Sequence, residues 1–187
     1  LIQSTASNDA PRLDYSTGAE AFLLEPQSTN LVPYSEDFMQ GWILSNATIV
    51  SNSIISPNGL SNASKITTSV FGGGLSDSLS VSDGNLTFSL FVKKGTTNGI
   101  RLRIDAATDS NGFFDLVNNT VYSSTDDASI ESFGNGWYKI SVSANITSFS
   151  KVAIYTTDGS SNYENGSVYI YGAQLEQNSY ATSYIPT

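Results

Sequence analysis

The stretch LTFSLFVKKGTTNGIRLRID, residues 86–105, shows most clearly which fold the chain adopts. Every second residue of its first half is apolar, which places Leu86, Phe88, Leu90 and Val92 on one face. Such alternation predicts a β-strand with one face buried. The run IRLRID, residues 100–105, alternates in the same way, and the polar KGTTNG between the two runs is typical of a turn. We therefore expect two antiparallel strands joined as a hairpin.

The same period-two pattern continues along the rest of the chain. The clearest further runs are WYKISVSA at 137–144 and KVAIYT at 151–156. Shorter strands are expected at 21–24, 42–49, 65–68, 75–81, 113–116, 120–122, 128–133 and 168–175. Dipeptides such as Asp83-Gly84 and Asn111-Gly112 predict turns between them. About a dozen short strands predict an all-β fold, a two-sheet antiparallel β-sandwich of the jelly-roll, concanavalin-like type.

A chain of 187 residues has the length of one domain. Residues 1–30 contain two prolines and few apolar positions, so we expect an extended lead-in that packs on the domain. Residues 31–187 are expected to form the sandwich. The chain opens on Leu1 with no initiator Met or signal segment, which indicates a piece of a longer protein.

Composition excludes several kinds of chemistry. The chain has no Cys and no His, so disulfides, thiolate metal sites and imidazole catalysis are all absent. Its net charge of -9 makes nucleic acid and anionic membranes unexpected partners. No apolar run reaches the roughly 20 residues that span a bilayer, so we expect no membrane insertion.

Four of the eight basic residues nevertheless fall within residues 91–105. If the four clear strands share one sheet, their outward side chains form one surface: Phe91, Lys93, Arg101, Arg103, Trp137, Lys139, Lys151 and Tyr155. Aromatic faces can stack on a pyranose ring, while Arg and Lys donate to its hydroxyl or carboxylate groups. This surface is our predicted ligand-binding site.

Plainer interpretations stay open for these residues. Alternating basic residues also solubilise an outer sheet face and pair with acids such as Asp105. Trp137 follows a Gly-Asn-Gly turn, and Trp42 begins a strand, so both are also expected to pack structurally. No strand carries acidic residues at period two, as a glycosidase would require, and we expect no enzyme activity.

Three segments carry a resemblance to a known family: Pro11–Phe38 (PRLDYSTGAEAFLLEPQSTNLVPYSEDF), FGNGWYKISVSA at 133–144, and VYIYGAQLEQNSYATSYIPT at 168–187. Together they resemble a module of phage tail and head-fibre proteins that is also appended to secreted bacterial polysaccharide-degrading enzymes. The resemblance implies a non-catalytic carbohydrate-binding module that recognises a polysaccharide or cell-surface glycan, without identifying the sugar. If the basic residues of the predicted surface converge, we expect an anionic glycan. The resemblance also implies an extracellular location, secreted or on a virion surface, and other domains of the parent protein as partners. The alternative is a structural or assembly domain of a phage fibre that binds another protein.

The first and last segments are also similar to calcium-containing carbohydrate-binding modules. In those modules, carboxylates near the first and last strands hold a structural calcium ion. Carried over to this chain, Glu36 and Asp37 take the first role and Glu176 the second, whereas Gly172 and Ala173 replace the usual acidic pair. The resemblance thus implies calcium as a structural cofactor.

Overall fold

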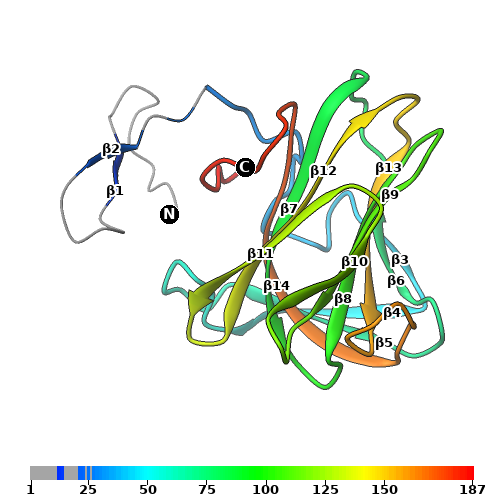
Figure 1. The fold of residues 1–187 in the computed structure, drawn as a ribbon. Helices are drawn as coiled ribbons and strands as arrows, with labels where there is room; N and C mark the ends of the chain where they lie inside the picture. Colours follow the sequence, from blue (N-terminus) through cyan, green and yellow to red (C-terminus); the bar gives the residue numbers. More distant parts are fainter. Residues whose placement is uncertain (1–11, 15–20, 24, 26) are drawn as a thin grey trace.

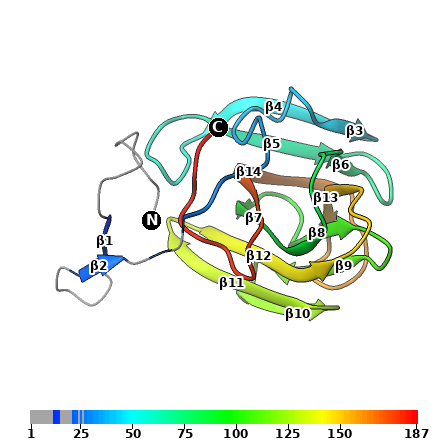
Figure 2. The same ribbon diagram turned by 90° about the horizontal axis from the view of Figure 1, so that it is seen from above.

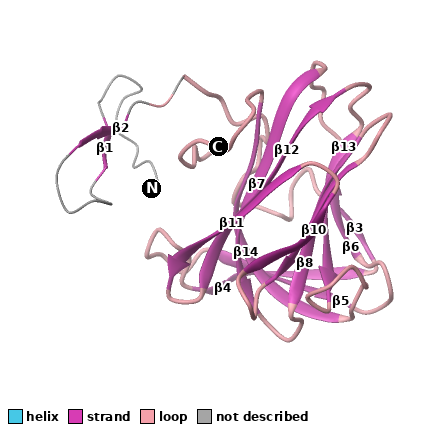
Figure 3. Cartoon of the chain, viewed as in Figure 1, coloured by secondary structure: helices cyan, strands magenta, loops and turns pink. Residues whose placement is uncertain are grey.

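The computed structural model describes residues 12–14, 21–23, 25 and 27–187. These residues form β-strands and loops, with no helix among them (Figures 1 and 3). None of the described segments is therefore a helix of the length and apolarity that a membrane span needs. A short pair, β1 (Arg12–Asp14) and β2 (Ala21–Leu23), runs antiparallel, and all other strands belong to two larger sheets.

Each large sheet has six antiparallel strands. Sheet I has the order β10 (Thr120–Ser124), β9 (Ser110–Asp115), β8 (Gly99–Asp105), β13 (Lys151–Thr157), β6 (Gly74–Asp77) and β3 (Ile43–Ser45). Sheet II has the order β11 (Asp127–Gly134), β12 (Trp137–Ile146), β7 (Gly84–Lys94), β14 (Gly166–Glu176), β5 (Ala63–Thr68) and β4 (Ala47–Ile54). The predicted all-β sandwich of jelly-roll type is confirmed.

The core lies between the two sheets and follows the predicted alternation. From β7 it takes Leu86, Phe88, Leu90 and Val92, and from β8 it takes Ile100, Leu102 and Ile104, all at most 1% exposed. Burying one such side chain contributes about 1.5–3 kcal/mol. The odd-numbered residues of β8 therefore face away from the core.

The predicted hairpin between residues 86–93 and 100–105 is wrong. Strand β7 pairs with β12 and β14 in sheet II, whereas β8 pairs with β9 and β13 in sheet I. The linker crosses between the sheets, and the backbone N–H groups of Thr96 and Thr97 donate to the carbonyl of Ser167 on β14. Alternation reports which face of a strand is buried but not which strand lies beside it, so it could not distinguish a hairpin from a crossover.

Two local predictions are also corrected. The strand expected at 42–49 divides at Asn46, which has a positive φ of 49°, into β3 of sheet I and β4 of sheet II. The turn expected at Asn111-Gly112 lies instead inside β9, where both residues pair with β8. Asn-Gly favours turns only as a local preference, and here strand pairing overrides it.

A second apolar cluster covers the outer face of sheet II. It consists of Ala63, Phe91, Trp137, Tyr171 and Tyr184, and we call it the outer cluster. Tyr184 comes from the C-terminal segment, which runs over this face beside the residues that precede β3 (Figure 2). Asn30 links the segment before β3 to β14 and to the C-terminal segment, since its Nδ2 donates to the carbonyls of Ala173 and Ile185.

The division into a lead-in of residues 1–30 and a domain of residues 31–187 stays a prediction. Most of the lead-in lies outside the described residues. Of its described part, Ser28 and Asn30 hydrogen-bond to residues of β14.

Candidate ligand-binding face

One row of side chains crosses the outer face of sheet I. Arg101 of β8 lies between its two register partners, Phe113 of β9 and Tyr155 of β13. The next position in the row, on β6, is Gly74, where an added Cβ would lie 2.7 Å from Cδ1 of Tyr155. The glycine thus leaves room for the tyrosine ring to lean across the sheet.

The guanidinium of Arg101 is held by neutral partners. Its Nε and Nη2 donate to Oδ1 of Asn111 at 3.1 and 2.6 Å, and its Nη1 donates to the hydroxyl of Tyr163. Guanidinium carries five N–H donors, so one remains on Nη1 and one on Nη2. Donors on the two terminal nitrogens of a guanidinium are of the kind that binds a carboxylate or a pair of hydroxyls.

Aromatic rings surround this cation. The Cζ atom of Arg101 lies 5.0 Å from the ring centre of Phe113, 5.4 Å from that of Tyr155 and 5.6 Å from that of Tyr163. Distances within about 6 Å give favourable cation–π attraction. The rings and hydrogen bonds together fix the guanidinium in one orientation.

The aromatic row continues into the loops at one end of the sheet. Tyr163, in the loop after β13, contacts the ring of Tyr155 at 5.5 Å and that of Phe71 at 5.1 Å. Phe71 lies in the loop after β5, and its side chain is 74% exposed. We call the set Phe71, Arg101, Phe113, Tyr155 and Tyr163 the Arg101 face.

The neighbouring charges on sheet I cancel one another. Arg103 forms ion pairs with Asp105 and Asp109, and Lys151 lies 3.5 Å from Asp105. These two cations and two carboxylates make a neutral group. Arg101, by contrast, has no carboxylate in ion-pair contact within the described part of the chain. The positive charge of this face therefore centres on Arg101.

The predicted single surface is split by the strand order. Arg101, Arg103, Lys151 and Tyr155 lie on the outer face of sheet I, and Phe91, Lys93, Trp137 and Lys139 lie on that of sheet II. Because the core separates the two sheets, no ligand can contact both sets across one face.

Two of the sheet II residues are buried in the outer cluster. Phe91 is 1% exposed and packs edge-to-face against Phe133 and Tyr184. Trp137 is 3% exposed, and its indole N–H donates to the carbonyl of Ile55 at 3.2 Å. The structural interpretation of Trp137 fits this geometry. Trp42 is buried too, but in the core between the sheets, where its ring packs beside Phe38.

The two lysines of this face hold backbone groups. Nζ of Lys93 donates to the carbonyl of Asn135 in the β11–β12 turn, at 2.6 Å. Nζ of Lys139 donates to the carbonyl of Thr182 at 2.5 Å. Burial lowers the pKa of Lys139, although Glu176, Glu25 and Glu131 act in the opposite direction.

The three carboxylates expected to bind calcium do not meet. Oε1 of Glu36 accepts from the hydroxyls of Tyr171 and Tyr184, at 2.7 and 3.2 Å, whereas the half-buried Asp37 accepts from Met39 and Gln40 of its own loop. Burial, with a smaller effect of the Glu36 charge, raises the pKa of both tyrosines, so both are donors at neutral pH.

Glu176 belongs to a separate network. It is fully buried, and its two oxygens accept from Ser28, Gln174 and both the hydroxyl and the backbone N–H of Thr182. No three acidic side chains of the described chain cluster closely enough to hold a metal ion. These residues therefore do not fit a calcium site, because N–H and O–H donors already occupy the oxygens a cation would need.

The sequence did not identify all of the Arg101 face. Phe113 lies in the strand expected at 113–116, but the turn expected at Asn111-Gly112 excluded Asn111 from that strand, and the pairing of β9 with β8 left no sign in the sequence. Phe71 is followed directly by three glycines, which predict a loop and not a strand that would bury the ring. The sequence therefore did indicate that Phe71 is exposed. Tyr163 and Asn111 come from a loop and a neighbouring strand, and only the fold brings them to Arg101.

No protein-family model matches the chain, and no curated protein matches it. Several solved structures are similar to it. The enzymatically active domain of tailspike protein 4 from bacteriophage CBA120 is 12% identical with a TM-score of 0.45, over 78% of this chain and 21% of that chain. The CBM22-1–GH10 modules of Clostridium thermocellum xylanase 10B, complexed with xylohexaose, are 15% identical with a TM-score of 0.47. That match covers 82% of this chain and 29% of the xylanase chain. The CBM22-1 xylan-binding domain from Paenibacillus barcinonensis is 12% identical with a TM-score of 0.46. That match covers 83% of this chain and 95% of the xylan-binding domain.

The chain spans about a fifth of the matched tailspike chain and under a third of the xylanase chain. The sandwich itself is established by the strand pairings described above.

Proposed function

We propose that the Arg101 face binds a polysaccharide and that the protein is a non-catalytic carbohydrate-binding module of an extracellular protein, a secreted enzyme or a phage fibre. One observation carries the proposal. Arg101 is fixed among three aromatic rings by neutral partners and keeps one N–H on each terminal nitrogen for a ligand. A preorganised donor fork costs little entropy when a ligand binds.

The aromatic side chains supply the remaining contacts. Sugar rings have C–H faces that pack on aromatic faces, and a row of rings suits successive units of a chain. Phe71 is exposed at one end of the row, where it serves no core. Exposed aromatics on a soluble domain mark contact surfaces.

Acidic glycans are the favoured ligands. Arg101 is the one cation of sheet I whose charge no described carboxylate compensates, because Arg103 and Lys151 pair with Asp105 and Asp109. A uronate carboxylate would accept the two remaining N–H groups as a bidentate pair. The same fork also accepts two neighbouring hydroxyls, so neutral chains bind more weakly at the same place.

The proposal is binding without bond cleavage. Glycoside hydrolysis needs two carboxyl groups in an acid and a base role across the ligand. On this face Asp105 and Asp109 are both ion-paired with Arg103, so they are already engaged within the domain and do not form an acid and base pair around a ligand.

Gel retardation in a panel of neutral and acidic polysaccharides tests this function. Retention is expected on at least one acidic polysaccharide, and Tyr155→Ala and Phe71→Ala should each weaken it by about tenfold, equivalent to about 1.4 kcal/mol. Leu60→Ala removes an equally exposed apolar side chain from a different loop and should leave retention unchanged. Migration unaffected by every polysaccharide would reject the proposal.

A protein partner is the second candidate, and the edge of sheet I favours it. Strand β3 ends the sheet, and its Ile43 is 62% exposed. An unpaired edge with apolar side chains can accept a strand from another chain. A phage-fibre assembly role would use this edge, and Ile43→Lys would abolish it while leaving polysaccharide retention intact.

A further inference from the structure

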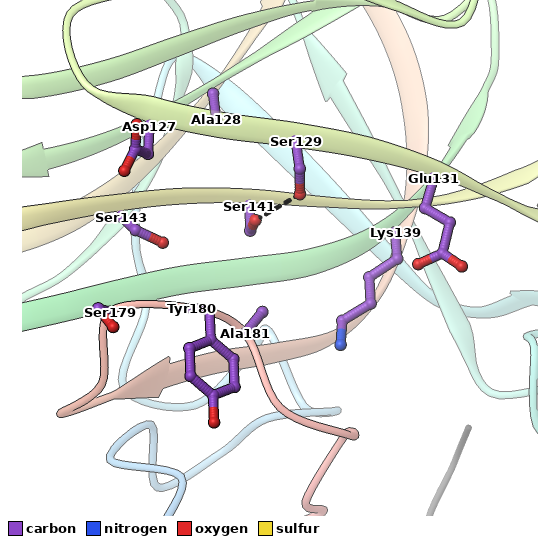
Figure 4. A pocket seen from close by; sticks show the side chains of 10 residues that line it. All are labelled: Asp127, Ala128, Ser129, Glu131, Lys139, Ser141, Ser143, Ser179, Tyr180 and Ala181. Atoms are coloured by element: carbon purple, nitrogen blue, oxygen red, sulfur yellow. Dashed lines mark hydrogen bonds between the residues drawn. The ribbon is translucent and has the colours of Figure 1, made fainter. Parts of the chain in front are cut away.

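A pocket of about 260 Å³ lies on the outer face of sheet II, away from the Arg101 face (Figure 4). Strands β11 and β12 form its floor, and residues 179–181 of the C-terminal segment form the opposite wall. Three register pairs line the floor: Asp127 with Ser143, Ser129 with Ser141, and Glu131 with Lys139. At about 6.6 Å between successive pairs, the floor is about 13 Å long.

The floor is rich in hydroxyl groups with unused bonding capacity. Ser129 and Ser141 hydrogen-bond to each other at 2.8 Å (Figure 4). Ser143 accepts a hydrogen bond from the hydroxyl of Thr87 at 2.8 Å. A hydroxyl offers one donor and two acceptor sites, so each of the three serines keeps at least one site for a ligand. A hydroxyl group of a ligand can therefore donate a hydrogen bond to these serines or accept one from them.

The charges of the pocket select against anions. Asp127 and Glu131 contribute two carboxylates at the two ends of the floor, and Lys139, the register partner of Glu131, contributes one ammonium. The ammonium donates once, to the carbonyl of Thr182, so two of its three N–H donors remain. The carboxylates can accept hydrogen bonds from sugar hydroxyls, and the ammonium can donate to them. The lining as a whole carries one net negative charge, which repels a carboxylate on the ligand.

Tyr180 completes the pocket. It belongs to the wall formed by the C-terminal segment, and its side chain is 50% exposed. A half-exposed ring can pack on the C–H face of a sugar while its hydroxyl stays in water. The volume lies just below the 300–1,000 Å³ typical of drug-sized ligands, which suits one ring.

We propose that this pocket is a second binding site, which takes a single uncharged sugar unit. It has its own residues on the opposite sheet, so it does not rest on polysaccharide binding at the Arg101 face. Together the two sites would let one domain hold two glycan chains, and linked weak sites gain apparent affinity.

Backbone amide chemical shifts of the isotope-labelled chain test the proposal. The probes are D-galactose, D-glucose, D-mannose, D-xylose and D-glucuronate, each titrated through the millimolar range. We expect saturable shifts at Ser129, Ser141, Ser143 and Ala181 with at least one neutral sugar, and weaker shifts with glucuronate. Tyr180→Ala and Glu131→Gln should reduce the affinity at least fivefold, and both replace exposed side chains, so the fold should persist.

Two controls separate this site from the Arg101 face. Tyr122→Ala replaces an exposed tyrosine of sheet I and should leave the shifts unchanged, as should Arg101→Ala. Absence of saturable shifts with all four neutral sugars would overturn the proposal. So would shifts that both pocket variants leave intact, or a stronger response to glucuronate than to any neutral sugar.

Discussion

Asn111 accepts two hydrogen bonds from Arg101 on a single atom, its Oδ1, at 3.1 Å from Nε and 2.6 Å from Nη2. Asn111 is itself held in place, since its backbone N–H donates to the hydroxyl of Thr125 at 2.8 Å. The relationship fixes the direction of the guanidinium while leaving its charge uncompensated. Asn111 is therefore a positioning residue for the proposed site.

Replacing Asn111 should separate orientation from charge. Asn111→Ala frees the guanidinium and should weaken retention on an acidic polysaccharide by about tenfold, or about 1.4 kcal/mol. Asn111→Asp keeps the acceptor but neutralises Arg101, so it should abolish the preference for acidic over neutral chains. Equal retention of both variants and the unmodified chain in affinity gels would show that Asn111 does not position Arg101.

Tyr184 should stabilise the domain through the outer cluster. Its ring packs against Phe91 and Tyr171, and its hydroxyl bonds to Ser35 and Glu36. Tyr184→Ala should cost about 3–5 kcal/mol of unfolding free energy, as large-to-small core replacements do. Tyr184→Phe loses only the hydroxyl contacts and should cost about 1–3 kcal/mol.

Urea unfolding measures both effects, with Tyr180→Ala as the control. Tyr180 is half exposed, so its loss should change the unfolding free energy by less than about 0.5 kcal/mol. If Tyr184→Ala is no worse than the control, the C-terminal segment does not contribute to the core of this face.

Asp77 should make stability depend on pH. It is 4% exposed, and its Oδ2 has no hydrogen-bond partner among the described residues. Burial raises its pKa above 3.8, so the folded chain binds this proton more tightly than the unfolded chain. The stability contributed by this proton is complete below pH 3.8 and is lost as the pH rises through the raised pKa.

Asp77→Asn removes that titration. As the pH rises, the free energy of unfolding of the variant should therefore increase relative to that of the unmodified chain. The increase should be about 1.4 kcal/mol for each unit by which the pKa of Asp77 is raised. Unfolding midpoints in urea across the acidic to neutral range give the comparison. Curves that stay parallel from acid to neutral pH would mean that Asp77 is not desolvated in the folded chain.

Removal of calcium should not affect stability. Glu36 and Glu176 are saturated by hydroxyl, amide and backbone donors in separate networks, and Asp37 caps a loop. EDTA should therefore leave the melting temperature unchanged, and added calcium should not raise it. A rise in melting temperature with calcium that Glu176→Gln abolishes would restore the calcium hypothesis.

The sequence predicted the fold because each half-buried strand alternates apolar and polar residues. Leu86, Phe88, Ile100 and Leu102 all face the core as the alternation required. The order of the strands in the sheets produces no such pattern in the sequence. The segment containing Lys93 and the one containing Arg101 therefore looked like one hairpin, although they belong to opposite sheets.

The most specific sequence motifs turned out to be structural. The segments that carry the family resemblance supply Asn30, Glu36, Gln174, Glu176 and Tyr184, which join the two chain ends over sheet II. Such residues must match one another in detail, so they form recognisable motifs. The Arg101 face combines common residue types from three strands and two loops, a combination that no local pattern encodes.

The central claim is that the charge of Arg101 holds an acidic glycan, and retardation of Arg101→Ala in gels containing an acidic polysaccharide tests it most directly. Lys94→Ala is the matched control, because it removes the same charge from an exposed residue at the end of β7. We predict that Arg101→Ala lowers the affinity at least tenfold while Lys94→Ala changes it less than twofold, with both variants remaining folded. Equal retention of Arg101→Ala and Lys94→Ala would contradict the account.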